Sequence, residues 1–207
     1  MAAEVSPGMA PDEPAGRKMT VPDPQDCKRH GSLARTRRLH SDAPRGILVR
    51  RGGNHLSEKL YLEDVFVGQR FVTGTYALTA DAIKAFARDY DPQPFHTDED
   101  AAKDTFFCGL AASGWHTAAI TMRLQIDSGP PIAGGMIGAG GEISWPRPTR
   151  PGDVLRVESE ITEVKPSKSR PERGFATMKS ETKNQDGEVV QLLVVKLLVW
   201  RRPEYGF

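Results

Sequence analysis

A carboxylate and an imidazole lie five positions apart in the stretch 91–96, which reads Asp-Pro-Gln-Pro-Phe-His. Proline fixes its own φ and pushes the preceding residue toward extended geometry, so Asp91 and Gln93 cannot easily continue a helix. The stretch is therefore predicted to be a stiff loop that aims Asp91 and His96 at one point. Held on one water, such a pair can take a proton from the water and return a proton to a neighbouring carbon, which is general acid–base catalysis.

The same spacing also fits a structural role. A lone aspartate and a lone histidine near a helix end are more often a cap and a surface residue than a catalytic pair. Asp89 is a rival carboxylate, but it falls on the tail of the preceding helical pattern and is expected to be solvated. A metal site is not expected, because His96 and His116 lack the close spacing and the nearby cysteines of a zinc site.

Two helices are predicted to flank the Asp91–His96 stretch. Before it, Thr79 suits an N-cap and apolar residues recur at helical spacing: Ile83, Phe86, Ala87 and Tyr90. After it, Ser113-Gly114 opens a segment, residues 115–126, that is apolar on most of a helical circumference. A helix of that composition is expected to be buried.

The rest of the chain reads as strands, at residues 70–78, 136–145, 153–165, 173–184 and 189–201. Asp186-Gly187 predicts a hairpin between the last two. The final run is apolar enough to be a central strand that is covered on both faces. A long antiparallel sheet with one buried helix gives an α+β fold in which the sheet wraps around that helix.

Composition divides the chain into two parts. Residues 1–58 are rich in Pro, Gly, Arg and Asp and hold too few apolar residues to repay the entropy of ordering, which predicts a disordered extension. The alternative is a basic arm that docks on a partner. Residues 59–207 are predicted to form a single domain. The formal net charge of +1 gives no argument for a nucleic-acid or membrane-surface partner.

Cysteine content and hydropathy bear on the compartment. Cys27 lies in a polar stretch and Cys108 in an apolar run, so a structural disulfide is not expected and a reducing compartment is the default. The sequence has neither a membrane-length apolar run nor the apolar core of a signal peptide. The expected location is therefore cytoplasmic.

Three sequence features together resemble the MaoC-like (R)-specific enoyl-CoA hydratases of the hotdog fold. They are the 91–96 motif, Ser113-Gly114 at the start of a buried helix, and the turn at 147–153, which reads Arg-Pro-Thr-Arg-Pro-Gly-Asp. The resemblance covers about residues 60–202. It implies a hotdog fold and a homodimer or higher homo-oligomer. It also implies an acyl-CoA substrate held at the dimer interface, with no cofactor besides that coenzyme A thioester.

The resemblance also implies roles for single residues. Asp91 and His96 would be the catalytic pair, and the Gly114 amide would polarise the thioester carbonyl, with Ser113 and His116 beside the substrate. Three positions depart from the family pattern: Gln93 replaces an asparagine, Ser113 a histidine and Ala119 a serine. His116 has a second interpretation as a core histidine bonded to the backbone.

The implied reaction is the reversible addition of water to a 2-enoyl-CoA, which gives an (R)-3-hydroxyacyl-CoA. Two alternatives remain: an acyl-CoA thioesterase, and a non-catalytic acyl-CoA-binding partner subunit. Trp115 and Trp145 are assigned to packing. Arg147 and Arg150 could meet coenzyme A phosphates, but arginines beside a turn are commonly solvated, and neither is assigned to the site.

Overall fold

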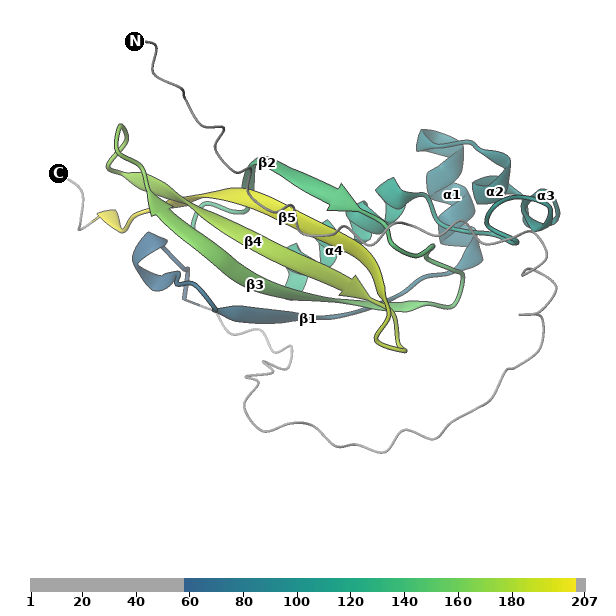
Figure 1. Ribbon diagram of the computed structural model, residues 1–207, viewed down its shortest axis with the longest axis horizontal. Helices are drawn as coiled ribbons and strands as arrows, with labels where there is room; N and C mark the ends of the chain where they lie inside the picture. Colours follow the sequence, from purple (N-terminus) through teal and green to yellow (C-terminus); the bar gives the residue numbers. More distant parts are fainter. Residues whose placement is uncertain (1–57, 204–207) are drawn as a thin grey trace, which may run out of the picture.

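The computed structural model describes residues 58–203, so the predicted extension over 1–58 lies, except for Glu58, outside the described residues. A five-stranded sheet is covered on one face by helix α4, and helices α1–α3 gather beyond one end of it (Figure 1). The strands are β1 (Arg70–Ala77), β2 (Ile137–Ser144), β3 (Val154–Pro166), β4 (Arg173–Lys183) and β5 (Val189–Trp200). This arrangement confirms the predicted α+β class, with five strands close to the predicted ranges.

The sheet has the order β1-β3-β4-β5-β2, and every neighbouring pair is antiparallel. The predicted hairpin joins β4 to β5, and Gly187 adopts φ 79° in its turn, a conformation that glycine tolerates. β5 lies between two strands, as predicted, but its outward face is not fully covered, because Val194 is 36% exposed. β2 forms an edge of the sheet.

The helices around the predicted site begin and end at local sequence signals. Thr79 caps α1 (Ala80–Tyr90) by accepting a hydrogen bond from the Ala82 N–H at 3.2 Å, as predicted. The prediction of a loop through His96 is wrong in part, because residues Pro94–Thr97 form the short helix α2. Proline suits the first position of a helix, where its missing N–H costs no hydrogen bond. Helix α3 (Glu99–Lys103) follows.

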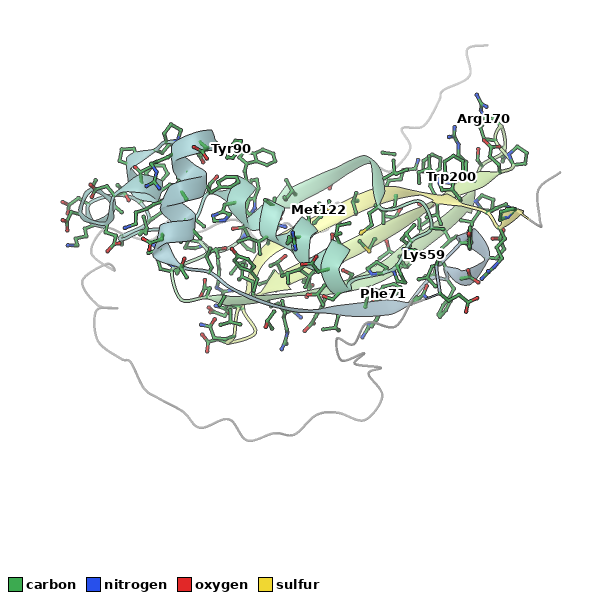
Figure 2. All side chains as sticks on the ribbon, turned by 180° about the vertical axis from the view of Figure 1, so that it is seen from behind. Lys59, Phe71, Tyr90, Met122, Arg170 and Trp200 are labelled. Carbon is green, nitrogen blue, oxygen red and sulfur yellow. The ribbon has the colours of Figure 1, made fainter. Side chains whose placement is uncertain are left out.

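Helix α4 (Gly114–Ser128) confirms the predicted long helix but not its complete burial. One face lies against the sheet. The opposite face carries exposed apolar side chains within the described chain: Trp115 is 63% exposed, Met122 47% and Ile126 60%. Figure 2 shows Met122 on the side of α4 that points away from the sheet.

The contact between α4 and the sheet is partly polar. Thr117, Thr121 and Gln125 recur every four residues on the buried face of α4. Their hydrogen bonds reach the turn before β3 and strands β4 and β5: Thr117 to Thr149 (3.0 Å), Thr121 to Thr182 (2.7 Å) and to Gln191 (2.9 Å), and Gln125 to Ser180 (2.9 Å). We call Thr117, Thr121 and Gln125, together with the side chains that they bond, the polar row.

Two apolar clusters make up the rest of the core. One joins α1, α4 and the strands near them: Leu78, Ile83, Leu110, Ala112, Ile120, Leu124, Leu155, Val157 and Val190. The other joins the short helix η2 (Leu62–Asp64) to β3–β5: Leu62, Val65, Ile132, Ile161, Ala176, Met178, Leu197 and Val199. α4 is therefore fixed by apolar packing and by hydrogen bonds together.

The expectation about the cysteines involves Cys27, which lies outside the described residues, so it stays a prediction. The cytoplasmic location that was argued from it stays a prediction as well. Over residues 58–203 no helix is long and apolar enough to cross a membrane.

Candidate functional site

Asp91 ends helix α1, and its carboxylate is held by neighbours on both sides. Its backbone N–H donates to the Ala87 carbonyl at 2.9 Å, which completes the last helical turn. Oδ1 accepts a hydrogen bond from the Gln93 amide at 2.7 Å, and the Ser113 hydroxyl also donates to the carboxylate. Burial raises the pKa of Asp91, but the hydrogen bonds from Ser113 and Gln93 and the nearby His96 outweigh it. The pKa of this carboxyl therefore lies below its usual range, and the group is ionised at neutral pH.

His96 lies in α2 and is buried. Its Nδ1 lies 2.7 Å from the Ala111 carbonyl oxygen. A carbonyl only accepts hydrogen bonds, so Nδ1 must carry the proton. In the neutral ring Nε2 then presents a lone pair, and Nε2 lies 3.4 Å from Oδ2 of Asp91. The rings of Phe95 and Phe107 lie 4.5 Å and 5.8 Å from the imidazole, so apolar walls surround it.

The Asp91 and His96 side chains present two acceptors that face each other. A carboxylate oxygen and an unprotonated Nε2 cannot hydrogen-bond directly, but both can accept from one water or one hydroxyl group between them. Transfer of a proton to Nε2 would give an imidazolium directly beside the carboxylate, which stabilises it. This arrangement suits the removal and return of one proton at a single place.

Ser113 and Gly114 form the start of α4 beside this pair. The Ser113 Oγ caps the helix by accepting from the Trp115 N–H at 3.2 Å, and its hydroxyl donates to Asp91. Ser113 therefore contacts groups of the protein itself, and its predicted contact with substrate stays a prediction. The Gly114 N–H is at the first position of the helix, where the helix supplies no acceptor and the helix dipole favours negative charge.

Glycine is required at position 114 by packing. A Cβ built there would lie 2.7 Å from Cε2 and 2.8 Å from Cδ2 of Trp145. The Trp145 indole is itself fixed, because its Nε1–H donates to Gln191 at 2.9 Å. The indole ring of Trp145 therefore covers the Gly114 Cα.

His116 lies on α4, three residues after Ser113, and is buried. Its ring stacks on Phe86 of α1 with centroids 4.5 Å apart and planes 2° apart. Its Nδ1 is buried and has no hydrogen-bond partner among residues 58–203, so within that part of the chain the backbone hydrogen bond of the core-histidine interpretation is absent at that atom. Burial lowers the pKa of His116, so the ring is neutral at ordinary pH.

The structure thus brings Asp91, His96 and Ser113 into contact, with Gly114 next in the chain, at the end of the molecule where α1 ends at Tyr90 (Figure 2). Two partners were missed. Gln93 was noted only as a departure from the family pattern, and the Ala111 carbonyl carries no signal in the sequence. Over residues 58–203 no cluster of three His, Cys, Asp or Glu side chains could hold a metal ion.

The sheet that wraps α4, with Asp91 and His96 beside the start of that helix, is the arrangement of a hotdog protein. Residues 65–184 match the MaoC like domain family, and the chain belongs to that family. A solved MaoC-like dehydratase from Rhodospirillum rubrum is 60% identical and superposes with a TM-score of 0.69, covering 70% of this chain and 99% of that one.

Two further relatives extend the comparison. The (R)-hydratase PhaJ1 from Pseudomonas aeruginosa is 27% identical with a TM-score of 0.56, and the match covers 70% of this chain and 88% of PhaJ1. The uncharacterized protein YdeM of Bacillus subtilis is 35% identical over 127 residues, which cover 60% of this chain and 87% of YdeM. The family resemblance seen in the sequence and the hotdog fold that it implied are confirmed.

Proposed function

We propose that this protein adds water reversibly to a 2-enoyl-CoA and so forms an (R)-3-hydroxyacyl-CoA. The observation that carries the proposal is the pair of facing acceptors, Asp91 Oδ2 and His96 Nε2, 3.4 Å apart beside the start of α4. The similarity to an (R)-hydratase supports the direction and stereochemistry of the reaction.

In the proposed mechanism, one water donates its hydrogens to Asp91 and His96. Nε2 takes one proton while the water oxygen bonds to the β-carbon, and the electron pair of the double bond moves to the thioester oxygen. The Gly114 N–H, at the positive end of α4, stabilises the enolate oxygen that forms. The proton then passes from His96 to the α-carbon. One water is consumed, its hydroxyl ends on the β-carbon and its other hydrogen on the α-carbon.

The Asp91 carboxylate has two tasks in this scheme. It orients the water, and it stabilises the imidazolium that exists while the proton is on His96. Its lowered pKa keeps it ionised for both. Because the carboxylate does not itself need to be protonated, His96 is assigned the proton transfer and Asp91 the electrostatic role.

The test is hydration of crotonyl-CoA and longer 2-enoyl-CoAs, followed as loss of the absorbance of the conjugated thioester. Asp91→Asn should lower kcat about 10²- to 10⁴-fold, because the variant loses the charge that orients the water and stabilises the imidazolium. The matched control is Asp89→Asn, an exposed aspartate two residues earlier on α1, which should behave as wild type. Equal rates for Asp91→Asn and wild type would rule out the assignment.

A free-thiol assay on the same samples distinguishes hydration from hydrolysis. Hydration leaves the thioester intact, whereas a thioesterase releases coenzyme A. Binding of the enoyl-CoA with neither reaction would identify an acyl-CoA-binding partner subunit instead.

We also propose that the protein acts as a homodimer. β2 is an edge strand, and seven of its eight residues are exposed. Helix α4 carries exposed Trp115, Met122 and Ile126 on its outer face. An unpaired edge and an apolar helix face are the surfaces that a second copy would cover. Sedimentation equilibrium should give twice the mass of the chain, and a monomer at micromolar concentration would contradict this.

A further inference from the structure

The Arg150 side chain has an environment that neither a coenzyme A contact nor a solvated turn explains. Its guanidinium donates to three main-chain carbonyls: Gly109 at 2.8 Å, Leu110 at 3.1 Å, and Phe107. The nearby carboxylate of Asp153 bonds the backbone of Arg150 and not its guanidinium: Oδ2 accepts from the Arg150 backbone N–H at 2.7 Å. The charge of Arg150 is therefore directed at one short segment of backbone, residues 107–110.

This segment cannot satisfy its own carbonyls in a regular element. Cys108 adopts φ 52° and Gly109 φ 135°, so the chain turns irregularly between α3 and α4. Half-buried or buried carbonyls in such a segment need donors from elsewhere in the protein. A planar guanidinium has five N–H groups in a fixed fork, so this one side chain can serve several carbonyls at once.

The next residue, Ala111, is hydrogen-bonded through both of its main-chain groups to residues of helix α2. Its N–H donates to the Phe95 carbonyl at 3.1 Å, and its carbonyl accepts from Nδ1 of His96 at 2.7 Å. On the far side, the Ala112 N–H donates to the Thr149 carbonyl at 2.9 Å. Thr149 therefore holds the backbone immediately after Ala111, and Arg150 holds the backbone immediately before it.

We propose that Arg150 is a positioning residue that keeps the proton of neutral His96 on Nδ1, by holding the Ala111 carbonyl in place. If that carbonyl moved away, the imidazole would lose the acceptor that selects this tautomer. The proton would then move to Nε2, and the Asp91 carboxylate, 3.4 Å away, would accept a hydrogen bond from this Nε2–H. Nε2 would no longer offer a lone pair to water. Asp91 and His96 would both still be present, but Nε2 of His96 could no longer accept a proton from water.

This inference deepens the proposed function, on which its kinetic part rests, and its structural part is tested without substrate. Nitrogen-15 NMR of histidine-labelled protein distinguishes the two neutral tautomers, and the His96 signals are those that disappear in His96→Asn. Wild type should carry the proton on Nδ1. Arg150→Met should shift His96 toward the Nε2-protonated form and lower kcat about 10- to 100-fold with KM within about twofold, as loss of a residue that orients a functional histidine does.

Two further variants make the comparison specific. Arg147→Met is the matched control, because Arg147 lies in the same turn but is half exposed and pairs with Glu188 at 3.4 Å. It should leave both the tautomer and kcat unchanged. Arg150→Lys keeps the charge but presents its donors from one atom, and it should give intermediate values for both. If Arg150→Met fails to fold, as circular dichroism would show, Arg150→Lys decides the question.

The proposal is overturned if wild-type His96 carries its proton on Nε2, or if the folded Arg150 variants keep the wild-type tautomer. A fall in kcat without a change of tautomer also overturns it. The proposed function fails separately: a protein that hydrates no enoyl thioester, but whose His96 tautomer depends on Arg150, would retain this inference and lose the other.

Discussion

His96 and His116 are buried to nearly the same degree, 4% and 6% exposed, yet their surroundings differ. His96 has a defined neighbour at each nitrogen: the Ala111 carbonyl at Nδ1 and the Asp91 carboxylate at Nε2. His116 stacks flat on Phe86, and its Nδ1 has no partner. Burial alone therefore does not give a histidine ring the neighbours that proton transfer requires.

The difference shows what each ring can contribute. Around His96 the Ala111 carbonyl faces Nδ1 and the Asp91 carboxylate faces Nε2, so each ring nitrogen has a polar neighbour. Around His116 burial lowers the pKa and no carboxylate opposes it, so this ring stays neutral. A neutral ring with an unpartnered nitrogen can donate or accept one hydrogen bond, but it is poorly suited to hold a proton in transit.

The largest effect is expected from His96→Asn. The asparagine amide can donate to the Ala111 carbonyl in place of Nδ1, while Nε2 is removed. We expect kcat for enoyl-CoA hydration to fall about 10²- to 10⁴-fold with little change in thermal stability. Steady-state kinetics and a melting curve on the same sample test this. A variant with wild-type kcat would place His96 with His116 among the non-reactive rings.

A smaller effect is expected from His116→Phe, measured as stability against pH. The pKa of His116 is lowered in the folded protein, so the unfolded chain binds a proton first as the pH falls below about 6.5 and the wild type loses stability there. At pH 5.5 this loss reaches at most about 1.4 kcal/mol. His116→Phe keeps the stacking on Phe86 and should remove that loss. Urea unfolding at pH 7.5 and 5.5 measures it; identical pH dependence in both proteins would contradict the contrast drawn between the two rings.

The smallest effect is expected from Ser113→Ala. Ser113 caps α4 and donates to Asp91, so the variant should lose about 1 kcal/mol through the cap. It should lose more stability than this at pH 6, because a hydrogen bond to the ionised carboxylate lowers the pKa of Asp91. A carboxyl with a lowered pKa stabilises the fold above its unfolded pKa and loses that contribution as the pH falls through the folded value, so the extra loss should shrink as the pH falls below about 3.8.

The control for Ser113→Ala is Thr79→Ala. Thr79 caps α1 through the Ala82 N–H and makes no contact with Asp91 in the described structure. Its loss of stability should be the same at pH 6 and pH 3 in urea unfolding. If the loss of stability depended on pH to the same extent in both variants, the effect would come from helix capping and not from the carboxylate.

The sequence predicted the parts of the fold that depend on local pattern. The Thr79 cap, the helix that ends before Pro92, the Asp186-Gly187 hairpin and the approximate ranges of the strands were all recognisable from neighbouring residues. The α4 helix was found, but its apolar outer face was assigned to the interior, because composition cannot tell a core from a surface that another chain would cover.

The site was predicted in its residues but not in its geometry. Asp91 and His96 were recognised from types and spacing, and proximity of Ser113 followed from the family resemblance. The Ala111 carbonyl, the guanidinium of Arg150 and the indole over Gly114 were not predicted. Each is a contact between residues about 15 to 40 positions apart, made by main-chain groups or by the shape of a ring, and local sequence does not encode such a contact.

The polar row under α4 also restricts how the protein can move. Apolar packing between a helix and a sheet tolerates small slides, but the threonine and glutamine side chains of the row, Thr117, Thr121 and Gln125, each have a defined partner on the turn before β3 or on the strands. A shift by one helical turn would carry these buried polar groups past apolar ones and leave them unpaired, at a cost of about 1–3 kcal/mol each. Slow hydrogen exchange should therefore extend along the whole buried face of α4, and the amide of Gly114 is presented from a helix with a single resting position.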